Sequence, residues 1–247
     1  MRLDRVIAVR NTKTVYRDGD KCIKVFNGEY SKEDVLAEAL NQARAEKMRI
    51  KVPEIYGVSR VDGKWAVISE FIKGKTVARL MAESPEKSDS FLELLVDLQL
   101  EVQREKCPLF ESLSEKARRG VSAAVGAGAE RGLLKAQLLT PDEENCVCHG
   151  DFTPENILVS DDGVPYILDW ANASRGNAAA DAAGTYLMLR RNGDPAAERY
   201  IGFFCEKSGL DGAEIGGWVP FAAAAQYAAA NERARRFLFS WLNRRDK

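Results

Sequence analysis

The chain has 247 residues, of which 45% are hydrophobic, and carries 36 basic against 37 acidic side chains. This near balance disfavours a nucleic-acid-binding protein, which needs a basic face to neutralise phosphates. No apolar run approaches the roughly 20 residues that span a bilayer, so we expect no membrane segment. The first residues lack the pattern of a secretory signal, and the five cysteines show no regular spacing, which favours a cytoplasmic protein with reduced thiols.

The first third of the chain has the pattern of a small antiparallel sheet with one helix. Apolar runs predict strands over residues 3–9, 14–17, 21–26, 54–61 and 65–70. Ser31 is a good N-cap for a helix between the third and fourth strands. One face of that helix is predicted to be buried, with Val35, Leu36, Ala39, Leu40 and Ala43.

Lys24 stands inside the third predicted strand, between apolar neighbours. A lysine there is either an exposed charge on an edge strand or a phosphate ligand that is held by an acidic partner. Glu38 in the following helix is the better candidate for that partner, and Glu46, two turns further on, is the weaker one. The loop of residues 10–13 contains no glycine, so its backbone is less able to approach phosphates closely, and we assign no ligand in it.

After the fifth predicted strand the sequence becomes mainly helical. Ser90 is expected to cap a helix that ends near Cys107-Pro108. Its apolar face is formed by Phe91, Leu94, Leu95, Leu98 and Val102. Further helices are predicted near residues 111–119, 133–139, 181–190, 196–207, 220–230 and 232–243.

The most informative segment is the run His149-Gly150-Asp151-Phe152-Thr153-Pro154-Glu155-Asn156. Asp151 can accept a proton, and the oxygen atoms of Asn156 and of Asp169, further along the chain, are hard ligands of the kind that Mg²⁺ prefers. Asp151 precedes Asn156 by five residues, the same interval that separates the base from the metal-binding asparagine in the kinase catalytic loop.

A hairpin is predicted between Asn156 and Asp169. Two apolar runs, 157–160 and 164–168, flank Asp161-Asp162-Gly163, which has the composition of a tight turn. Because a hairpin brings its two ends together, the side chains of Asn156 and Asp169 are expected to converge on one point.

These motifs resemble those of the aminoglycoside phosphotransferase and choline kinase-like family of small-molecule kinases. Residues 148–158 look like the catalytic loop of that family, and residues 168–170 look like its metal-binding segment. The resemblance implies the bilobal protein kinase-like fold, of the α+β class, in a single kinase-like domain. It places an N-terminal nucleotide lobe of antiparallel sheet and one helix at 1–70, a hinge at 71–75, and a mainly helical catalytic and substrate lobe at 76–247.

The resemblance also implies roles for individual residues. Asp151 would orient and deprotonate the hydroxyl group of the substrate, while Asn156 and Asp169 would hold Mg²⁺. His149, the only histidine, is expected to brace the loop by hydrogen bonding rather than to act as the base, and Asp181 is expected to anchor this segment.

Lys24 looks like the lysine that contacts the α and β phosphates of ATP in this family, with Glu38 as its ion-pair partner. The remaining ATP contacts that the resemblance implies are the backbone of Ser69 and Phe71 at the adenine edge, and Cys22 and Leu158 against the ring. Ordinary core packing is the alternative for the last two.

The sequence therefore predicts an ATP-dependent phosphotransferase that acts on a hydroxyl group of a small molecule, either an aminoglycoside-like antibiotic or a hydroxylated metabolite. Residues 184–247 contain seven acidic against ten basic side chains, which disfavours a polycationic acceptor. Two alternatives stand beside this prediction. A protein kinase is disfavoured because only eleven residues separate Asp169 from Asp181, and a nucleotide-binding scaffold without turnover is disfavoured because Lys24, Asp151, Asn156 and Asp169 are all present.

Overall fold

The computed structural model describes residues 5–9, 12–125, 129–138, 145–191, 193 and 195–242. Two compact units make up the chain, Met1–Leu80 with Glu155–Asn172 and Met81–Pro154 with Ala173–Lys247, and each is described by itself. The expected strand at residues 3–4, the loop residues 10–11 and the helix ends at 139 and 243 lie outside the described residues.

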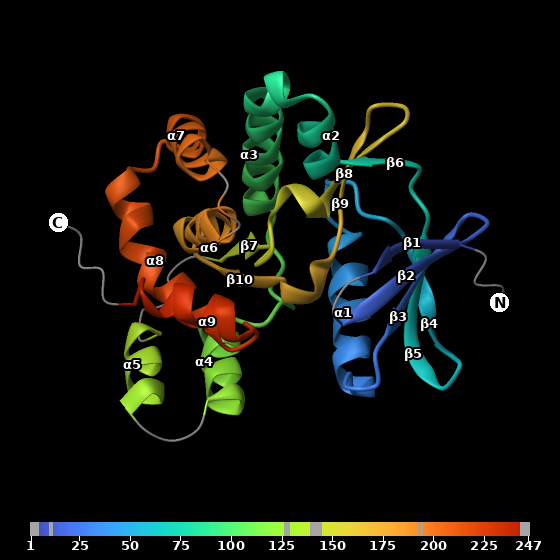
Figure 1. The fold of residues 1–247 in the computed structure, drawn as a ribbon, viewed down its shortest axis with the longest axis horizontal. Coiled ribbons are helices and arrows are strands. Elements are labelled where there is room, and N and C mark those ends of the chain that lie inside the picture. Colours follow the sequence, from blue (N-terminus) through green and yellow to red (C-terminus); the bar gives the residue numbers. More distant parts are fainter. Residues whose placement is uncertain are drawn as a thin grey trace. The chain divides into compact units, whose positions relative to one another are not determined.

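The first unit contains a five-stranded antiparallel sheet in the order β1-β2-β3-β5-β4 (Figure 1). Its strands are β1 (Arg5–Val9), β2 (Lys13–Asp18), β3 (Lys21–Phe26), β4 (Ile55–Val61) and β5 (Lys64–Glu70). The strand order along the chain, three strands, a helix and two strands, confirms the sequence prediction. In the centre of the sheet β3 buries Ile23, Val25 and Phe26, so its apolar run forms the core of this unit.

Helix α1 (Lys32–Ala45) begins at the predicted cap. The Ser31 hydroxyl accepts from the backbone N–H of Asp34, whose carboxylate in turn accepts from the N–H of Ser31. The predicted buried face is only partly right, because Leu36 and Leu40 are 43% and 51% exposed.

The buried face of α1 is rotated relative to the predicted apolar face, and it includes polar residues of the helix itself. Val35 and Ala39 are buried as expected, and the remaining buried positions are Glu38, Gln42 and Ala45. This orientation has a polar cause, since Glu38 pairs with Lys24 of β3 and the Gln42 amide donates to the carbonyl of Pro53 at 2.8 Å. Apolar spacing alone does not report these two polar contacts.

A second sheet of the first unit contains the predicted hairpin. It has the order β6-β8-β9, with β6 (Gly74–Thr76), β8 (Ile157–Ser160) and β9 (Pro165–Ile167). The turn is closed by Ser160, whose hydroxyl donates to the carbonyl of Val164 and accepts from its N–H. Gly74 is required on β6, because a Cβ atom there would lie 2.2 Å from the carbonyl oxygen of Val159.

The second unit is mainly helical. Its helices are α3 (Ser88–Arg104), α4 (Leu113–Ala124), α5 (Ala129–Gln137), α6 (Ala178–Arg191), α7 (Ala196–Ser208), α8 (Gly212–Tyr227) and α9 (Glu232–Phe239). The two short strands β7 (Cys146–Cys148) and β10 (Ser174–Gly176) pair antiparallel. Helix α2 (Val77–Glu83) crosses the boundary in sequence between the units.

Several helix starts differ from the prediction, most clearly those of α3 and α8. Helix α3 begins at Ser88, so Ser90 lies inside the helix and is not its cap; Leu95, Leu98 and Val102 are nevertheless buried as expected. Helix α8 begins at Gly212, after an Asp211 cap that accepts from the N–H of Ala213, and Pro220 lies in its interior. An interior proline costs a helix about 3 kcal/mol, which the buried apolar residues of α8 offset here.

Among the described residues, no helix is both long and apolar enough to cross a membrane.

Candidate active site

The hairpin of the first unit brings Asn156 and Asp169 to the same end. Ile157 of β8 pairs with Ile167 of β9, and the N–H of Leu168 donates to the carbonyl of Asn156 at 2.8 Å. Asn156 ends the single turn Pro154–Asn156 before β8, and Asp169 follows Leu168 directly. Two residues that are thirteen positions apart therefore leave the same end of one ladder, as the turn composition predicted.

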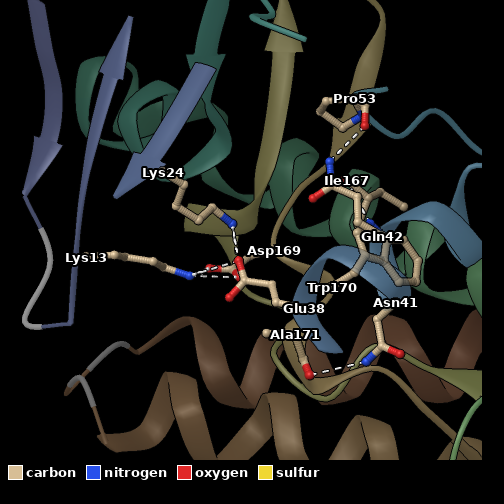
Figure 2. A network of polar contacts seen from close by, with 10 residues as sticks. All are labelled: Lys13, Lys24, Glu38, Asn41, Gln42, Pro53, Ile167, Asp169, Trp170 and Ala171. Atoms are coloured by element: carbon tan, nitrogen blue, oxygen red, sulfur yellow. Dashed lines mark hydrogen bonds and ion pairs between the residues drawn. The ribbon is translucent and has the colours of Figure 1, made fainter. Parts of the chain in front are cut away.

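Asp169 has an unusual backbone conformation, with φ of 62° in the left-handed region. Aspartate is one of the few residues other than glycine that enter this region with any frequency. The neighbouring segment is held in place, because the Trp170 indole donates to the carbonyl of Ile167 and the Asn41 amide of α1 donates to the carbonyl of Ala171 (Figure 2). Such strain persists where the surroundings fix the backbone, and it is often found at functional sites.

Four charged side chains, Lys13, Lys24, Glu38 and Asp169, form what we call the charge cluster (Figure 2). The Lys24 ammonium lies 2.6 Å from the Glu38 carboxylate and 3.5 Å from that of Asp169. The ion pair expected between Lys24 and Glu38 is therefore present. Burial alone would lower the pKa of Lys24, but the nearby carboxylates of Asp169 and Glu38 outweigh it and raise this pKa above its ordinary value.

Lys13 is the member of the charge cluster that the sequence analysis missed. Its ammonium lies 3.0 and 2.8 Å from the two carboxylate oxygens of Asp169, and 3.5 Å from Glu38. A signal for Lys13 was available, because the register of the β2–β3 hairpin pairs Lys13 with Phe26 and Val15 with Lys24. Residues two apart along a strand face the same side of the sheet, so this register puts both lysines on one face.

Of the positions expected around adenine, Cys22 and Ser69 lie on the five-stranded sheet, Phe71 follows its strand β5, and Leu158 lies in the second sheet. Cys22 of β3 pairs with Ser69 of β5, and burial raises the pKa of the Cys22 thiol, against the opposing effects of Lys24 and of a hydrogen bond to Ser69. The N–H of Phe71 donates to the carbonyl of Asp20 at 2.8 Å, so a contact from this N–H to adenine requires that bond to open. Leu158 pairs with Thr76 and Tyr166 in the second sheet.

In the second unit, Asp181 lies at the centre of a buried polar network. One carboxylate oxygen accepts from the N–H of Gly150 at 2.9 Å, and the other accepts from the side-chain amides of Gln99 at 2.8 Å and Gln103 at 3.3 Å. The Tyr200 hydroxyl donates to the Gln99 carbonyl oxygen, and burial, together with the charge of Asp181, raises the pKa of Tyr200. This network ties α3, α6 and α7 to the loop that carries Asp151.

His149 is fully buried beside Asp151. Its Nδ1 accepts from the N–H of Asp151 at 3.2 Å, and its ring meets the ring of Phe152 edge to face. Asp151 itself is partly buried. These contacts tie the His149 ring to the loop that carries Asp151.

The side chains at the open end of the hairpin suit Mg²⁺. Asn156 and Asp169 supply an amide and a carboxylate oxygen, and Mg²⁺ typically takes only one or two protein ligands besides substrate phosphates and waters. Among the described residues, no group of three or more His, Cys, Asp or Glu side chains is arranged to hold a metal. Two oxygen donors are compatible with a magnesium ion that also takes ligands from phosphates and water.

A lysine of a five-stranded antiparallel sheet that pairs with a glutamate of the following helix, with an Asn-hairpin-Asp segment further along the chain, is typical of the protein kinase-like class of phosphotransferases. A family model described as the phosphotransferase enzyme family matches residues 6–215, and the chain belongs to this family. Comparison with curated protein sequences gave no significant match.

Solved structures confirm the protein kinase-like fold. Aminoglycoside phosphotransferase APH(3'')-Id from Streptomyces rimosus, in complex with ADP and streptomycin, matches with a TM-score of 0.64 and 18% identity over 88% of this chain and 91% of its own. Choline kinase LicA from Streptococcus pneumoniae matches with a TM-score of 0.65 and 12% identity over 95% and 89%. A thermostable mutant of APH(4)-Ia, in a ternary complex with AMP-PNP and hygromycin B, matches with a TM-score of 0.65 and 11% identity over 97% and 94%.

Proposed function

We propose that the protein is a small-molecule kinase that transfers the γ-phosphate of ATP directly to a hydroxyl group of its acceptor. The observation that carries this proposal is the charge cluster, in which Lys24 bridges Glu38 and Asp169. A lysine held between a helix glutamate and the metal-binding aspartate is the arrangement that orients nucleotide phosphates in kinases. Membership of the phosphotransferase enzyme family and the nucleotides bound by APH(3'')-Id and APH(4)-Ia support ATP as the donor.

In this proposal Asn156 and Asp169 hold Mg²⁺, which offsets the charge of the phosphates when it is bound. Lys24 binds the α and β phosphates, and Glu38 holds the Lys24 ammonium in place. The backbone of Ser69 and Phe71 binds the adenine edge, and Cys22 and Leu158 pack against the ring.

Asp151 is proposed to position the acceptor hydroxyl and to accept its proton late in the transfer. Its loop is held from one side by His149 and from the other by Asp181, through the N–H groups of Asp151 and Gly150. A base in a rigid loop keeps the hydroxyl group in line with the γ-phosphate, which is the main contribution of protein to this reaction. No phosphoenzyme is needed.

The proposed function also assigns a role to each lobe of the chain. Residues 1–70 form the nucleotide lobe, residues 71–75 the hinge, and residues 76–247 the catalytic and substrate lobe. We place the acceptor against the carboxy-terminal helices and the enzyme in the cytoplasm, where ATP is available.

The acceptor itself need not be an aminoglycoside. Streptomycin, hygromycin B and choline, the compounds associated with the matching structures, are all hydroxylated cations, whereas residues 184–247 of this chain are net basic. A neutral or anionic hydroxylated metabolite is therefore at least as well supported as an aminoglycoside.

The test is to incubate the protein with Mg·ATP and fractionated pools of metabolites and aminoglycosides, and to follow new phosphorylated species by mass spectrometry. Asp151→Asn should form no product while it still binds Mg·ADP. Asp162→Asn, a change of the same kind in the exposed hairpin turn, should form product at the wild-type rate. If the wild-type protein does not bind Mg·ATP, the proposal is wrong; tight binding without any product favours the scaffold.

A further inference from the structure

Both carboxylate oxygens of Asp169 accept hydrogen bonds from the same ammonium group, that of Lys13. The two distances are 3.0 and 2.8 Å, while Lys24 lies further away, at 3.5 Å. The Lys13 side chain is only 14% exposed, although lysine is seldom buried unless it is paired. Lys13, and not Lys24, is therefore the main partner of the aspartate that we propose as a metal ligand.

The charge cluster is neutral as a whole, with two ammonium groups and two carboxylates. The two lysines differ in which carboxylate of the cluster they contact most closely. Lys24 is anchored by a 2.6 Å contact to Glu38, whereas Lys13 lies 3.5 Å from Glu38 and makes its short contacts only to Asp169. If Asp169 took another cation, Lys24 would keep its short contact to Glu38, whereas Lys13 would be left with the 3.5 Å contact to Glu38 and the face of the Phe26 ring, 5.8 Å away.

A divalent cation at Asp169 must take at least one of the oxygens that Lys13 now occupies. The cation and the ammonium repel each other at such short range, and an oxygen atom that binds a metal is a poorer acceptor for a lysine. The long, flexible stem of lysine allows its ammonium to move by several ångströms without any change of backbone. Nucleotide phosphates bound in front of the same face of the sheet would offer it new oxygen partners.

We propose that Lys13 is an exchangeable counterion of Asp169, which it neutralises in the empty site and leaves for the nucleotide phosphates when metal and nucleotide bind together. This inference rests on the proposed function. In this role Lys13 weakens the binding of metal without nucleotide and strengthens the binding of the metal–nucleotide complex. Metal and nucleotide are therefore expected to bind together rather than metal first.

A purely structural role for Lys13 predicts the opposite result for the metal. If Lys13 only clamps Asp169 in its left-handed conformation, then removal of the ammonium loosens the ligand and weakens every form of binding. The sign of the change in metal affinity therefore separates exchange from clamping.

The experiment measures Mn²⁺ binding through the loss of the free-ion electron paramagnetic resonance signal, with and without ADP, for the wild-type protein and Lys13→Met. We expect Lys13→Met to bind Mn²⁺ alone about tenfold more tightly and Mn·ADP about tenfold more weakly, a usual size for coupling between neighbouring sites. Lys64→Met, which changes an exposed lysine at the start of β5, should match the wild-type protein in both. Adding Asp169→Asn to Lys13→Met should remove the gain in Mn²⁺ affinity, which assigns it to this carboxylate.

Weaker or unchanged Mn²⁺ binding by a folded Lys13→Met protein, as judged by its melting temperature, overturns the inference. Failure of the proposed function has a different signature, in which the wild-type protein does not bind Mn·ADP. The measurement with Mn²⁺ alone still decides whether Lys13 competes for Asp169 in that case.

Discussion

Each unit of the molecule places one aspartate in a polar cluster, and the two clusters are built from different partners. Asp181 is 5% exposed and, within the described part of the chain, accepts from neutral groups, the Gly150 N–H and the amides of Gln99 and Gln103. Asp169 has a side chain 23% exposed and is bound by the ammonium groups of two lysines. The two carboxylates lie twelve positions apart in the chain, and the partners of Asp169 are the ones on flexible side chains that can move away.

This difference separates a structural carboxylate from a binding one. Neutral donors on packed helices and on a buried loop cannot leave Asp181 without becoming unsatisfied, at about 1–3 kcal/mol for each group. Ammonium groups on flexible stems can exchange one anion for another at small cost, because they remain paired in either state. The cluster around Asp181 therefore fixes a geometry, and the charge cluster is suited to hold a ligand.

The largest effect is expected at Asp169. Asp169→Ala should lower turnover by about 10³-fold or more, because it removes a proposed metal ligand and the charge that it contributes. Asp62→Ala is a matched control, since Asp62 is the other described non-glycine residue with positive φ, at 49°, and lies in the β4–β5 turn. Both variants should lose about 1 kcal/mol of stability through the left-handed backbone, Asp169→Ala should lose more because Lys13 and Lys24 lose its carboxylate, and steady-state kinetics should show a loss of turnover only for Asp169→Ala.

The effect on turnover is specific to the metal ligand only if Asp169→Ala remains folded. Urea denaturation should therefore give a cooperative transition for both alanine variants, with the lower midpoint for Asp169→Ala. Equal turnover in both would mean that Asp169 does not act in the reaction, and the contrast between the two carboxylates would be lost.

Asp181→Ala should show the reverse pattern, with stability as its main loss. The change leaves the Gly150 N–H and two glutamine amides without their acceptor, so we expect a fall of about 3 kcal/mol in the free energy of unfolding. Chemical denaturation measures this directly, and Mg·ADP binding by the folded fraction should stay close to wild type. If Asp181→Ala unfolds at the wild-type midpoint, the network does not hold the loop that carries Asp151.

Much of this arrangement could be predicted from the sequence. The features that were predicted correctly join residues that are close together in the chain. The hairpin between Asn156 and Asp169, the Ser31 cap and the ion pair of Lys24 with Glu38 all join residues at most fourteen positions apart. Turn composition and cap chemistry act over that range, and the pair of Lys24 with Glu38 was implied by the family resemblance. The kinase-like order of strands followed from the same local patterns.

The features that were missed depend on contacts between distant segments. Lys13 meets Asp169 across 156 positions, and Tyr200 meets Gln99 across 101. A glutamine in the sequence of an amphipathic helix is predicted to face solvent. The residues adjacent to it in the sequence do not indicate that a buried carboxylate will contact it. The rotation of α1 has the same origin, because the buried positions of Glu38 and Gln42 are set by partners outside the helix.

Two lysines in different surroundings give a second comparison, which can be tested through the pH dependence of stability. Two carboxylates raise the pKa of Lys24, whereas burial lowers the pKa of Lys116 in α4 to about 8, only partly opposed by Glu111. The unfolded chain binds more protons than the folded one between about pH 8 and 10.5, so this group makes the folded state more stable as the pH rises through that interval. Below about pH 8 the folded protein bears the full cost of a charged, buried lysine.

Lys116→Met should consequently stabilise the protein at pH 7, by about 2 kcal/mol after loss of the hydrogen bond from Lys116 to the carbonyl of Ala173. Denaturation at several pH values should show this advantage shrinking between about pH 8 and 10.5. A difference that does not change with pH would mean that Lys116 is charged in the folded protein throughout, and that its environment resembles that of Lys24.

The smallest effect is expected at the outer edge of the Asp181 network. Tyr200→Phe leaves the Gln99 carbonyl oxygen without its donor, which should cost about 1 kcal/mol of stability and lower kcat while the KM for ATP is unchanged. Tyr186→Phe is the matched control, because its hydroxyl donates at 3.1 Å to the exposed carboxylate of Glu198, which water can replace. Since Gln99 connects Tyr200 to Asp181, a kcat effect shows that the neutral cluster positions the catalytic loop, and equal kcat in both variants shows that the network serves stability alone.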